Sequence, residues 1–287
     1  MGRGAGERRR AGLAWGLCVI ALTAWTGGAR AQNGLHASLS ELLDLYVRDG
    51  QVYYRALQQD RAKLDRYIAS LNVPSATYDA WTPGDQAAFW INAYNAFVLE
   101  AVIDHYPIAG GSPSYPAKSI RQISGVFERQ QHRAAGRSVT LDQIETTILP
   151  TFEDPRMLLA LGRGAVGSTR LRSEAFTGAR LEAQLQGVVS EFASASRLLQ
   201  VDTASNVITV SPILSWREAE FVGAYGDDPP DSNGALAQRS PIERAILRLV
   251  EPNLLPLERA MVDRGDFTMV FGTFDWRLND LTGGRID

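Results

Sequence analysis

The stretch that decides the fold is residues 82–105, which read TPGDQAAFWINAYNAFVLEAVIDH. Thr82 is a predicted N-cap, the proline after it suits the first position of a helix, and Asp85 follows three residues after the cap. Between Phe89 and Ile103 the residues are apolar on nearly every side of the expected helix, so the helix is predicted to be buried all round. Pro107 should end it.

Two carboxamides interrupt this apolar helix. Asn92 and Asn95 are three residues apart and therefore share one face. Because a buried carboxamide without hydrogen bonds is unfavourable by a few kcal/mol, each must find partners. One interpretation is that they tie the helix to a loop backbone, and the other is that they line a polar ligand pocket.

On either side of this helix, further helices are expected in the segments 39–48, 57–71, 173–198, 216–225 and 242–250, with further caps at Thr140 and Ser240. Three short strands are expected at 157–161, 207–210 and 267–271. Long loops rich in Gly, Pro, Asn and Asp are expected at 108–117 and 226–239. These elements predict an α+β fold, mostly helical around a small β-sheet.

The first 31 residues have the pattern of a signal peptide. Several arginines lie near the N-terminus, and an apolar stretch follows from Leu13 to Trp25. Ala29-Arg30-Ala31 then offers small residues for cleavage. We therefore expect residues 1–31 to be removed and residues 32–287 to form one globular domain that is periplasmic or secreted. The apolar stretch is too short to remain as a stable membrane span.

Removal of this segment changes the charge and the cysteine content. The chain has 29 basic and 32 acidic residues, and residues 1–31 hold five Arg and one Glu, so the remainder carries 24 basic and 31 acidic residues, a net −7. Such a balance argues against nucleic acid or an anionic membrane surface as a partner. The single cysteine, Cys18, leaves with the signal, which excludes disulfides and thiol chemistry.

No cofactor is expected. The three histidines, His36, His105 and His132, are too widely spaced to form a local metal-binding pair, so a zinc site is not predicted. A calcium or magnesium ion held by carboxylates is left open.

Arginines gather between residues 156 and 180, where five of them accompany one acidic residue. The expected strand at 157–161 would lead into a glycine-rich loop and then into a helix from Ser173, a geometry that favours anion binding at exposed backbone N–H groups. Ligand contacts are therefore predicted for Arg156, Arg163, Ser168 and Arg170, together with the two asparagines. The alternative is that the arginines pair with surface acids.

The sequence supports catalytic residues less well than ligand-binding residues. Ser168 lacks the following glycine of a hydrolase elbow and any histidine placed to activate it. Glu145 and Asp275 are the best carboxylates for acid–base work, although each also suits a structural role. Trp81, Trp216 and Trp276 could stack on sugars, but such spread-out tryptophans are more often core residues.

Several segments, in chain order, together resemble a known family: VYYRAL at 52–57, AFWINAYNA at 88–96, LDQIE at 141–145, DPR at 154–156 and FDWRLN at 274–279. Across about residues 51–280 the chain resembles the family called domain of unknown function 547. The resemblance implies no settled activity, and it suggests a distant likeness to papain or transglutaminase folds.

The chain departs from this family where chemistry would be sought. Members commonly carry a His shortly after the DPR element and a Cys-Pro in the next loop, whereas this chain has MLLAL at 157–161 and GRGAVGSTR at 162–170. The usual His after the Ile-Glu pair is replaced by Thr146. Any thiol mechanism suggested for relatives is therefore absent here.

Three functions remain in view. The favoured one is a non-catalytic binding module for a small anionic ligand or peptide, acting through the loop at 162–172. The alternative is a hydrolase or transferase that uses carboxylates and no thiol. The third is an assembly protein with a protein partner. On the favoured hypothesis, replacing Arg163 and Arg170 by alanine should leave the fold intact and abolish anion binding.

Overall fold

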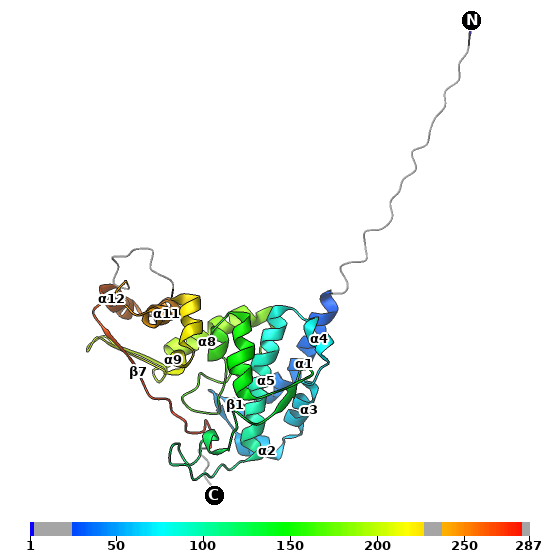
Figure 1. Cartoon of the computed structure of the whole chain (residues 1–287), viewed down its shortest axis with the longest axis horizontal. Helices are drawn as coiled ribbons and strands as arrows, with labels where there is room; N and C mark the ends of the chain where they lie inside the picture. The colour runs from blue at the N-terminus through cyan, green and yellow to red at the C-terminus, as the bar shows by residue number, and fades with distance from the viewer. Residues whose placement is uncertain (3–24, 227–236, 283–287) are drawn as a thin grey trace.

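The computed structural model describes residues 1–2, 25–226 and 237–282, with side chains in the first long helix described from Gly34 onward. At its centre stands helix α5 (Pro83–Asp104), as the sequence predicts (Figure 1). The Thr82 hydroxyl accepts a hydrogen bond from the Asp85 backbone N–H at 3.2 Å. Phe89, Trp90 and Tyr94 are fully buried, so the helix is enclosed on all sides.

Helices from the first part of the chain pack against α5. They are α1 (Trp25–Tyr46), α2 (Tyr54–Gln59), α3 (Ala62–Ser70) and α4 (Ser75–Asp79). The helix predicted at 57–71 is therefore two helices. The chain turns at Asp60, whose carboxylate accepts a hydrogen bond from the Tyr46 hydroxyl at 2.9 Å, a long-range contact that no local pattern indicates.

A three-stranded sheet lies in the later part of the chain, beside α11 and α12 (Figure 1). Strand β6 (Val207–Val210) pairs antiparallel with β5 (Leu199–Asp202) and parallel with β7 (Thr268–Phe271). The predicted strands at 207–210 and 267–271 are thus confirmed. The surrounding helices are α8 (Leu181–Ser194), α9 (Ile213–Trp216), α10 (Glu218–Tyr225), α11 (Pro241–Val250) and α12 (Pro256–Arg264).

Two predicted elements around the arginine-rich segment are wrong. The apolar run at 157–161 belongs to a single helical turn, α7 (Arg156–Leu159), because a short apolar run fits a buried helix as well as a strand. The helix predicted from Ser173 begins only at Leu181, after a 3₁₀ turn η4 (Gly178–Arg180). The strand–loop–helix geometry expected for an anion site is therefore not present.

The structure contains two small hairpins that were not predicted from the sequence. Strands β1 (Val47–Arg48) and β2 (Gln51–Val52) join through Asp49-Gly50, and both turn residues have positive φ, at 51° and 80°. This conformation is that of a type I′ turn, which Asp-Gly favours. The second hairpin joins β3 (His132–Ala134) to β4 (Arg137–Val139).

Helical turns of three kinds follow Thr140, which forms the predicted capping box with Gln143. Helix α6 (Leu141–Gln143) widens into η2 (Ile144–Ile148), a π-helical turn, and then tightens into η3 (Leu149–Phe152). A further 3₁₀ turn, η1 (Ile120–Gln122), precedes it, and η5 (Glu251–Asn253) follows α11. Wide π turns are frequent at functional sites.

The stretch 274–280, called here the closing segment, runs between two early parts of the chain. The backbone N–H groups of Val166 and Gly167 donate to the carbonyls of Arg277 and Asp275, each at 2.8 Å. At its other end the Val52 N–H donates to the Asn279 carbonyl at 2.9 Å. The closing segment approaches so closely that a Cβ on Gly167 would lie 2.6 Å from the Asp275 nitrogen.

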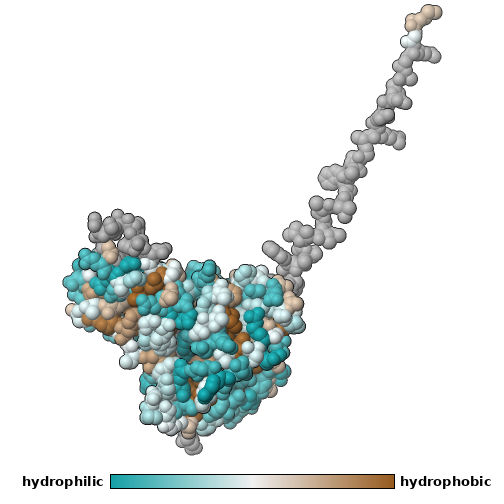
Figure 2. Space-filling model, viewed as in Figure 1, coloured by the Kyte–Doolittle hydropathy of each residue, from teal (hydrophilic) through white to brown (hydrophobic). Residues whose placement is uncertain are grey.

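One apolar core joins these elements, and the fold is α+β and mostly helical, as predicted. On the face shown in Figure 2, hydrophilic and pale residues dominate and apolar ones show between them. No helix in the described residues is long and apolar enough to cross a bilayer. The predicted signal peptide falls largely on residues 3–24, which lie outside the described residues. The likeness to papain or transglutaminase folds stays a prediction.

Candidate functional site

Charged and aromatic side chains from five separate parts of the chain line one pocket of about 200 Å³, called here the arginine pocket. It lies where η1, the α6–η2 turns, the loop after α7, the end of α9 and the closing segment meet. Its lining residues are Arg121, Phe127, Asp142, Glu145, Thr146, Arg163, Trp216, Arg217 and Trp276.

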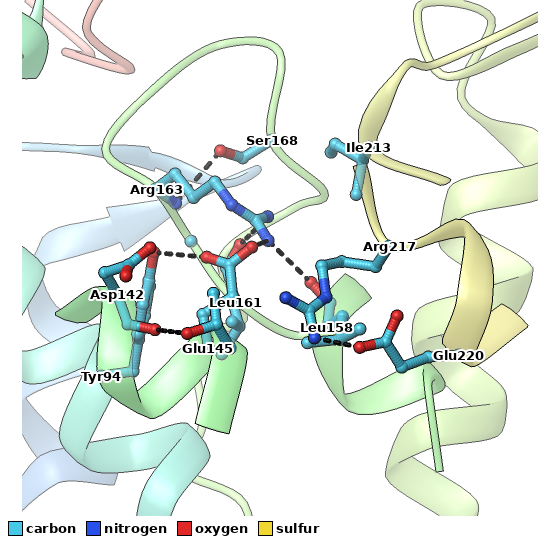
Figure 3. A network of polar contacts seen from close by, with 12 residues as sticks. Tyr94, Asp142, Glu145, Leu158, Leu161, Arg163, Ser168, Ile213, Arg217 and Glu220 are labelled. Carbon is cyan, nitrogen blue, oxygen red and sulfur yellow. Dashed lines mark hydrogen bonds and ion pairs between the residues drawn. The ribbon is translucent and has the colours of Figure 1, made fainter. Parts of the chain in front are cut away.

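A buried ion pair forms the floor of this pocket (Figure 3). Nη2 of Arg163 lies 2.6 Å from Oε1 of Glu145, and the Tyr94 hydroxyl donates to Oε2 of the same carboxylate at 3.2 Å. The Arg163 side chain is only 2% exposed and that of Glu145 15% exposed. Burial and the Glu145 charge raise the pKa of Tyr94 well above its usual value, so the tyrosine acts as a neutral donor.

The remaining contacts of Arg163 hold it in place. Its Nη1 and Nη2 also donate to the carbonyls of Leu161 and Leu158, each at 3.4 Å, and its backbone N–H donates to the Ser168 hydroxyl at 3.1 Å. Burial is the largest influence and would lower the pKa of Arg163, but the charge of Glu145, the nearby Tyr94 and the hydrogen bond to Glu145 together raise it, so the net shift is upward. Arg163 is therefore a fixed cation beneath the pocket.

Two further arginines line the pocket, and each has a hydrogen-bond donor that is not used within the described residues. Arg121 binds Glu128 through Nη1 at 2.5 Å, and Arg217 binds Glu220 through Nη2. In both, however, the Nε–H is buried and has no hydrogen-bond partner among the described residues. Buried donors are normally satisfied, so two unsatisfied ones at a single pocket make it a candidate site for an acceptor from outside the chain.

Aromatic rings complete the wall. The rings of Trp216 and Trp276 are nearly parallel, at 9°, with centroids 6.1 Å apart, and Phe274 packs against both at 4.9 and 4.4 Å. The Arg121 guanidinium lies 4.7 Å from the Trp276 ring centroid. Trp216 is 42% exposed, so this wall also faces solvent. Apolar walls would strengthen the electrostatic attraction between the pocket arginines and an anion that entered the pocket.

Asp142 is the one lining carboxylate without a cationic partner in the described part of the chain. Burial raises its pKa, and the neighbouring charges of Glu145 and Glu128 raise it further, while Arg217 and Arg121 oppose this shift. Asp142 and Glu145 are three residues apart on the α6–η2 turns and line the same pocket. The pocket thus holds one paired and one unpaired carboxyl group.

Asn92 and Asn95 tie helix α5 to loop backbone, which was one of the two interpretations. Asn92 donates to the carbonyl of Phe176 at 2.8 Å and accepts from its N–H at 2.9 Å. Asn95 donates to the carbonyl of Ala160 at 3.1 Å and accepts from the N–H of Gly162 at 2.7 Å. Neither asparagine lines the arginine pocket.

The arginines that the sequence grouped together are dispersed in space. Arg156 binds Asp154 at 2.8 Å and Glu182 at 2.7 Å, and Arg170 lies 3.3 Å from Asp49. Of the predicted ligand-binding residues, only Arg163 lines the pocket, with Ser168 behind it.

The backbone of the loop is also occupied. The N–H groups of residues 162, 163, 166, 167 and 168 all donate within the protein. These five donors are therefore not open to an anion, which removes the expected loop geometry for anion binding.

The two catalytic candidates separate. Glu145 is in the pocket, whereas Asp275 lies outside its lining and forms a two-oxygen contact with its neighbour Arg277, with the shortest N–O distance at 2.5 Å. This contact, mainly through hydrogen bonds from Arg277, lowers the pKa of Asp275. Asp275 instead anchors the closing segment through its backbone, next to Trp276.

Arg121, Asp142 and Arg217 were not predicted as site residues. For Asp142 and Arg217 the available signal was their position: Asp142 lies inside the LDQIE segment and Arg217 follows Trp216. Their convergence depends on topology, which no local spacing reveals. In the described residues, no three His, Cys, Asp or Glu side chains are placed to hold a metal ion.

Comparisons with known proteins place this geometry in context. No curated protein matches the chain, and no solved structure matches it. A family model described as "Protein of unknown function, DUF547" matches residues 78–193, which include α5, the capping box at Thr140, the Arg163 loop and most of α8. This match supports the assignment of the chain to the family of proteins of unknown function, DUF547.

Proposed function

We propose that this is an exported protein that binds a small anionic ligand in the arginine pocket, without itself catalysing a reaction. The observation that carries the proposal is the pair of buried, unsatisfied Nε–H groups of Arg121 and Arg217. The N-terminal signal-like pattern supports export.

The donor chemistry favours a carboxylate or a phosphate. Each arginine already uses one terminal nitrogen on an acidic neighbour and keeps its Nε–H for another acceptor. Leaving a buried donor unsatisfied costs roughly 1–3 kcal/mol, so an oxygen that accepts from both would be strongly favoured. A charged acceptor makes the shorter and stronger bond with a guanidinium.

The size of the pocket limits what can enter. About 200 Å³ accommodates a carboxylate or phosphate with a few attached atoms, and the tryptophan wall suits an apolar or ring-shaped remainder. Arg163 contributes a long-range positive charge from below, although its own hydrogen bonds are used within the protein. The arginine-rich loop therefore supplies one pocket residue, and the other two basic residues come from elsewhere.

A second candidate function is acid–base catalysis by Asp142 and Glu145. The observation that favours it is the raised pKa of Asp142 beside the ion-paired Glu145, since two carboxyl groups in different environments can divide the roles of acid and base. Turnover of a bound ligand that is lost in Asp142→Asn while binding is kept would select this alternative.

The proposal is tested by thermal unfolding of the protein with phosphate, acetate, citrate and benzoate. A ligand present at about 100 times its Kd adds roughly 2.7 kcal/mol of stability, which raises the unfolding midpoint measurably. We expect at least one anion to raise the midpoint of the wild-type protein and to lose this effect in Arg217→Gln and in Arg121→Gln.

The matched control is Arg170→Gln, because Arg170 is an exposed arginine of the same chain that lies outside the pocket. It should respond to the anion as the wild type does. If no anion raises the unfolding midpoint, or if an anion raises it equally in all four proteins, the arginine pocket is not the binding site.

A further inference from the structure

A second cavity of about 430 Å³ adjoins the arginine pocket, between the η3–α7 region and helix α10. Its polar lining is acidic, with carboxylates of Glu153, Asp154 and Glu220, and its apolar lining includes Leu158. We call it the acidic cavity. No basic side chain is among its lining residues.

The two hollows share a partition made of identified contacts (Figure 3). Arg217 lines the arginine pocket and Glu220 lines the acidic cavity, and the two side chains form an ion pair across the boundary. Beside them, Leu158 lines the acidic cavity while its carbonyl accepts from Arg163 at 3.4 Å. One ion pair and one hydrogen bond therefore join lining residues of the arginine pocket to lining residues of the acidic cavity.

The partition is built from groups that can change partners. Arg217 and Glu220 are 17% and 25% exposed, so water reaches both side chains of this partly buried ion pair. Arg217 also keeps a buried Nε–H without a hydrogen-bond partner in the described residues. In the described residues, the Glu153 side chain has no hydrogen bond or ion pair, so the acidic side also has a spare carboxylate.

We infer that the anionic ligand of the arginine pocket is a zwitterion, a short peptide or amino acid, and that it binds across this partition. Its carboxylate pairs with Arg217 and Arg121, and its ammonium group pairs with Glu220 and Glu153. The ligand thereby replaces the Arg217–Glu220 pair with two pairs of its own. This inference rests on the proposed anion binding and names the class of ligand.

The electrostatic balance distinguishes a zwitterion from a simple anion. A monoanion that binds Arg217 competes with Glu220 for this arginine and brings a second negative charge close to the Glu220 carboxylate, a like-charge contact that disfavours binding. A zwitterion supplies the cation that Glu220 loses. Removing the ammonium charge of the ligand should therefore weaken its binding to the wild-type protein. Removing the Glu220 charge should abolish the difference in affinity between the ligands with and without the ammonium group.

The experiment compares Ala-Ala with N-acetyl-Ala-Ala by isothermal titration calorimetry on the wild-type protein, on Glu220→Gln and on Glu218→Gln. Glu218 is an exposed acid on the same helix that lines neither hollow, so it is the matched control. We expect Ala-Ala to bind the wild type and Glu218→Gln at least about tenfold more tightly than its acetylated form. In Glu220→Gln the two Kd values should come within about twofold of each other, with the acetylated form gaining affinity.

The outcomes separate the two proposals. If both peptides bind the wild type equally and Arg217→Gln abolishes both, anion binding stands and the zwitterion inference is overturned. Should the preference for Ala-Ala persist in Glu220→Gln, the inference is equally overturned. If neither peptide binds while phosphate or acetate stabilises the protein through Arg217, the ligand is not a peptide. Failure of every anion overturns both proposals.

Discussion

Replacing Arg163 by methionine is expected to destabilise the protein severely, although the sequence alone suggested that this arginine could be removed without harm. Methionine keeps most of the volume but removes the 2.6 Å contact to Glu145 and two hydrogen bonds to carbonyls. Glu145, which is 15% exposed in the wild-type protein, would keep only Tyr94 as a donor. Removing one partner of a buried pair costs about 3–5 kcal/mol, because the other charge stays buried and uncompensated.

Urea-induced unfolding measures this loss directly. If the uncompensated charge is the cause, adding Glu145→Gln to Arg163→Met should restore a substantial part of the stability, since the double variant buries no lone charge. Arg170→Met is the control, because its ion pair with the highly exposed Asp49 should be worth less than about 1 kcal/mol. A loss below about 1 kcal/mol in Arg163→Met, or no recovery in the double variant, would refute the reasoning.

Three further predictions concern other polar groups. Burial lowers the pKa of His36 from 6.5 to about 4. The stability that the neutral buried His36 contributes is therefore fully present above pH 6.5 and is lost as the pH falls towards 4. The loss is about 3 kcal/mol, and His36→Gln should flatten the pH profile of urea unfolding. Asn95→Ala leaves two buried backbone groups without partners and should cost about 2–4 kcal/mol by the same assay, whereas a loss under about 0.5 kcal/mol would contradict the clamp. Because the pKa of Asp142 is raised, the affinity for an anion should increase as the pH falls through this pKa and the carboxylate loses its charge. Asp142→Asn should bind the anion more tightly, with a flatter pH dependence in calorimetry. Identical pH profiles of affinity in the variant and the wild type would exclude Asp142 from the site.

Local patterns predicted the elements whose causes are local. The caps at Thr82, Thr140 and Ser240 and the buried helix α5 depend on spacings of three or four residues, and all are present. The strand at 207–210 is confirmed for the same reason, because β-branched residues and an adjacent turn specify it.

The failures involve segments whose conformation depends on distant partners. The apolar run after Pro155 predicts a strand but forms a helical turn, because an apolar run of this length has no period that separates strand from helix. The missed hairpin at Asp49-Gly50 is a different case, since a recognised turn signal is present and its flanking strands are only two residues long.

The candidate site was predictable only in part. Glu145 and Arg163 are each indicated by the sequence, yet their pairing joins residues 18 positions apart through a loop that no motif describes. Arg217 and Trp276 reach the same pocket from later elements. Charge density along the sequence was therefore a poor guide, because Arg156 and Arg170 lie in the same arginine-rich segment but bind acids elsewhere.

The closing segment bears on how the protein comes to be folded during synthesis. Residues near 52 and 166 complete their backbone pairing only with residues 275–279, and Trp276 arrives with them. A ribosome must therefore make almost the whole chain before the pocket has its last wall, and such long-range contacts slow folding. If the protein is exported as we propose, a nascent chain that stays open this long would remain available to translocation machinery that handles unfolded chains. The family-matched part at 78–193, produced alone, would lack the closing segment that holds its loop in place.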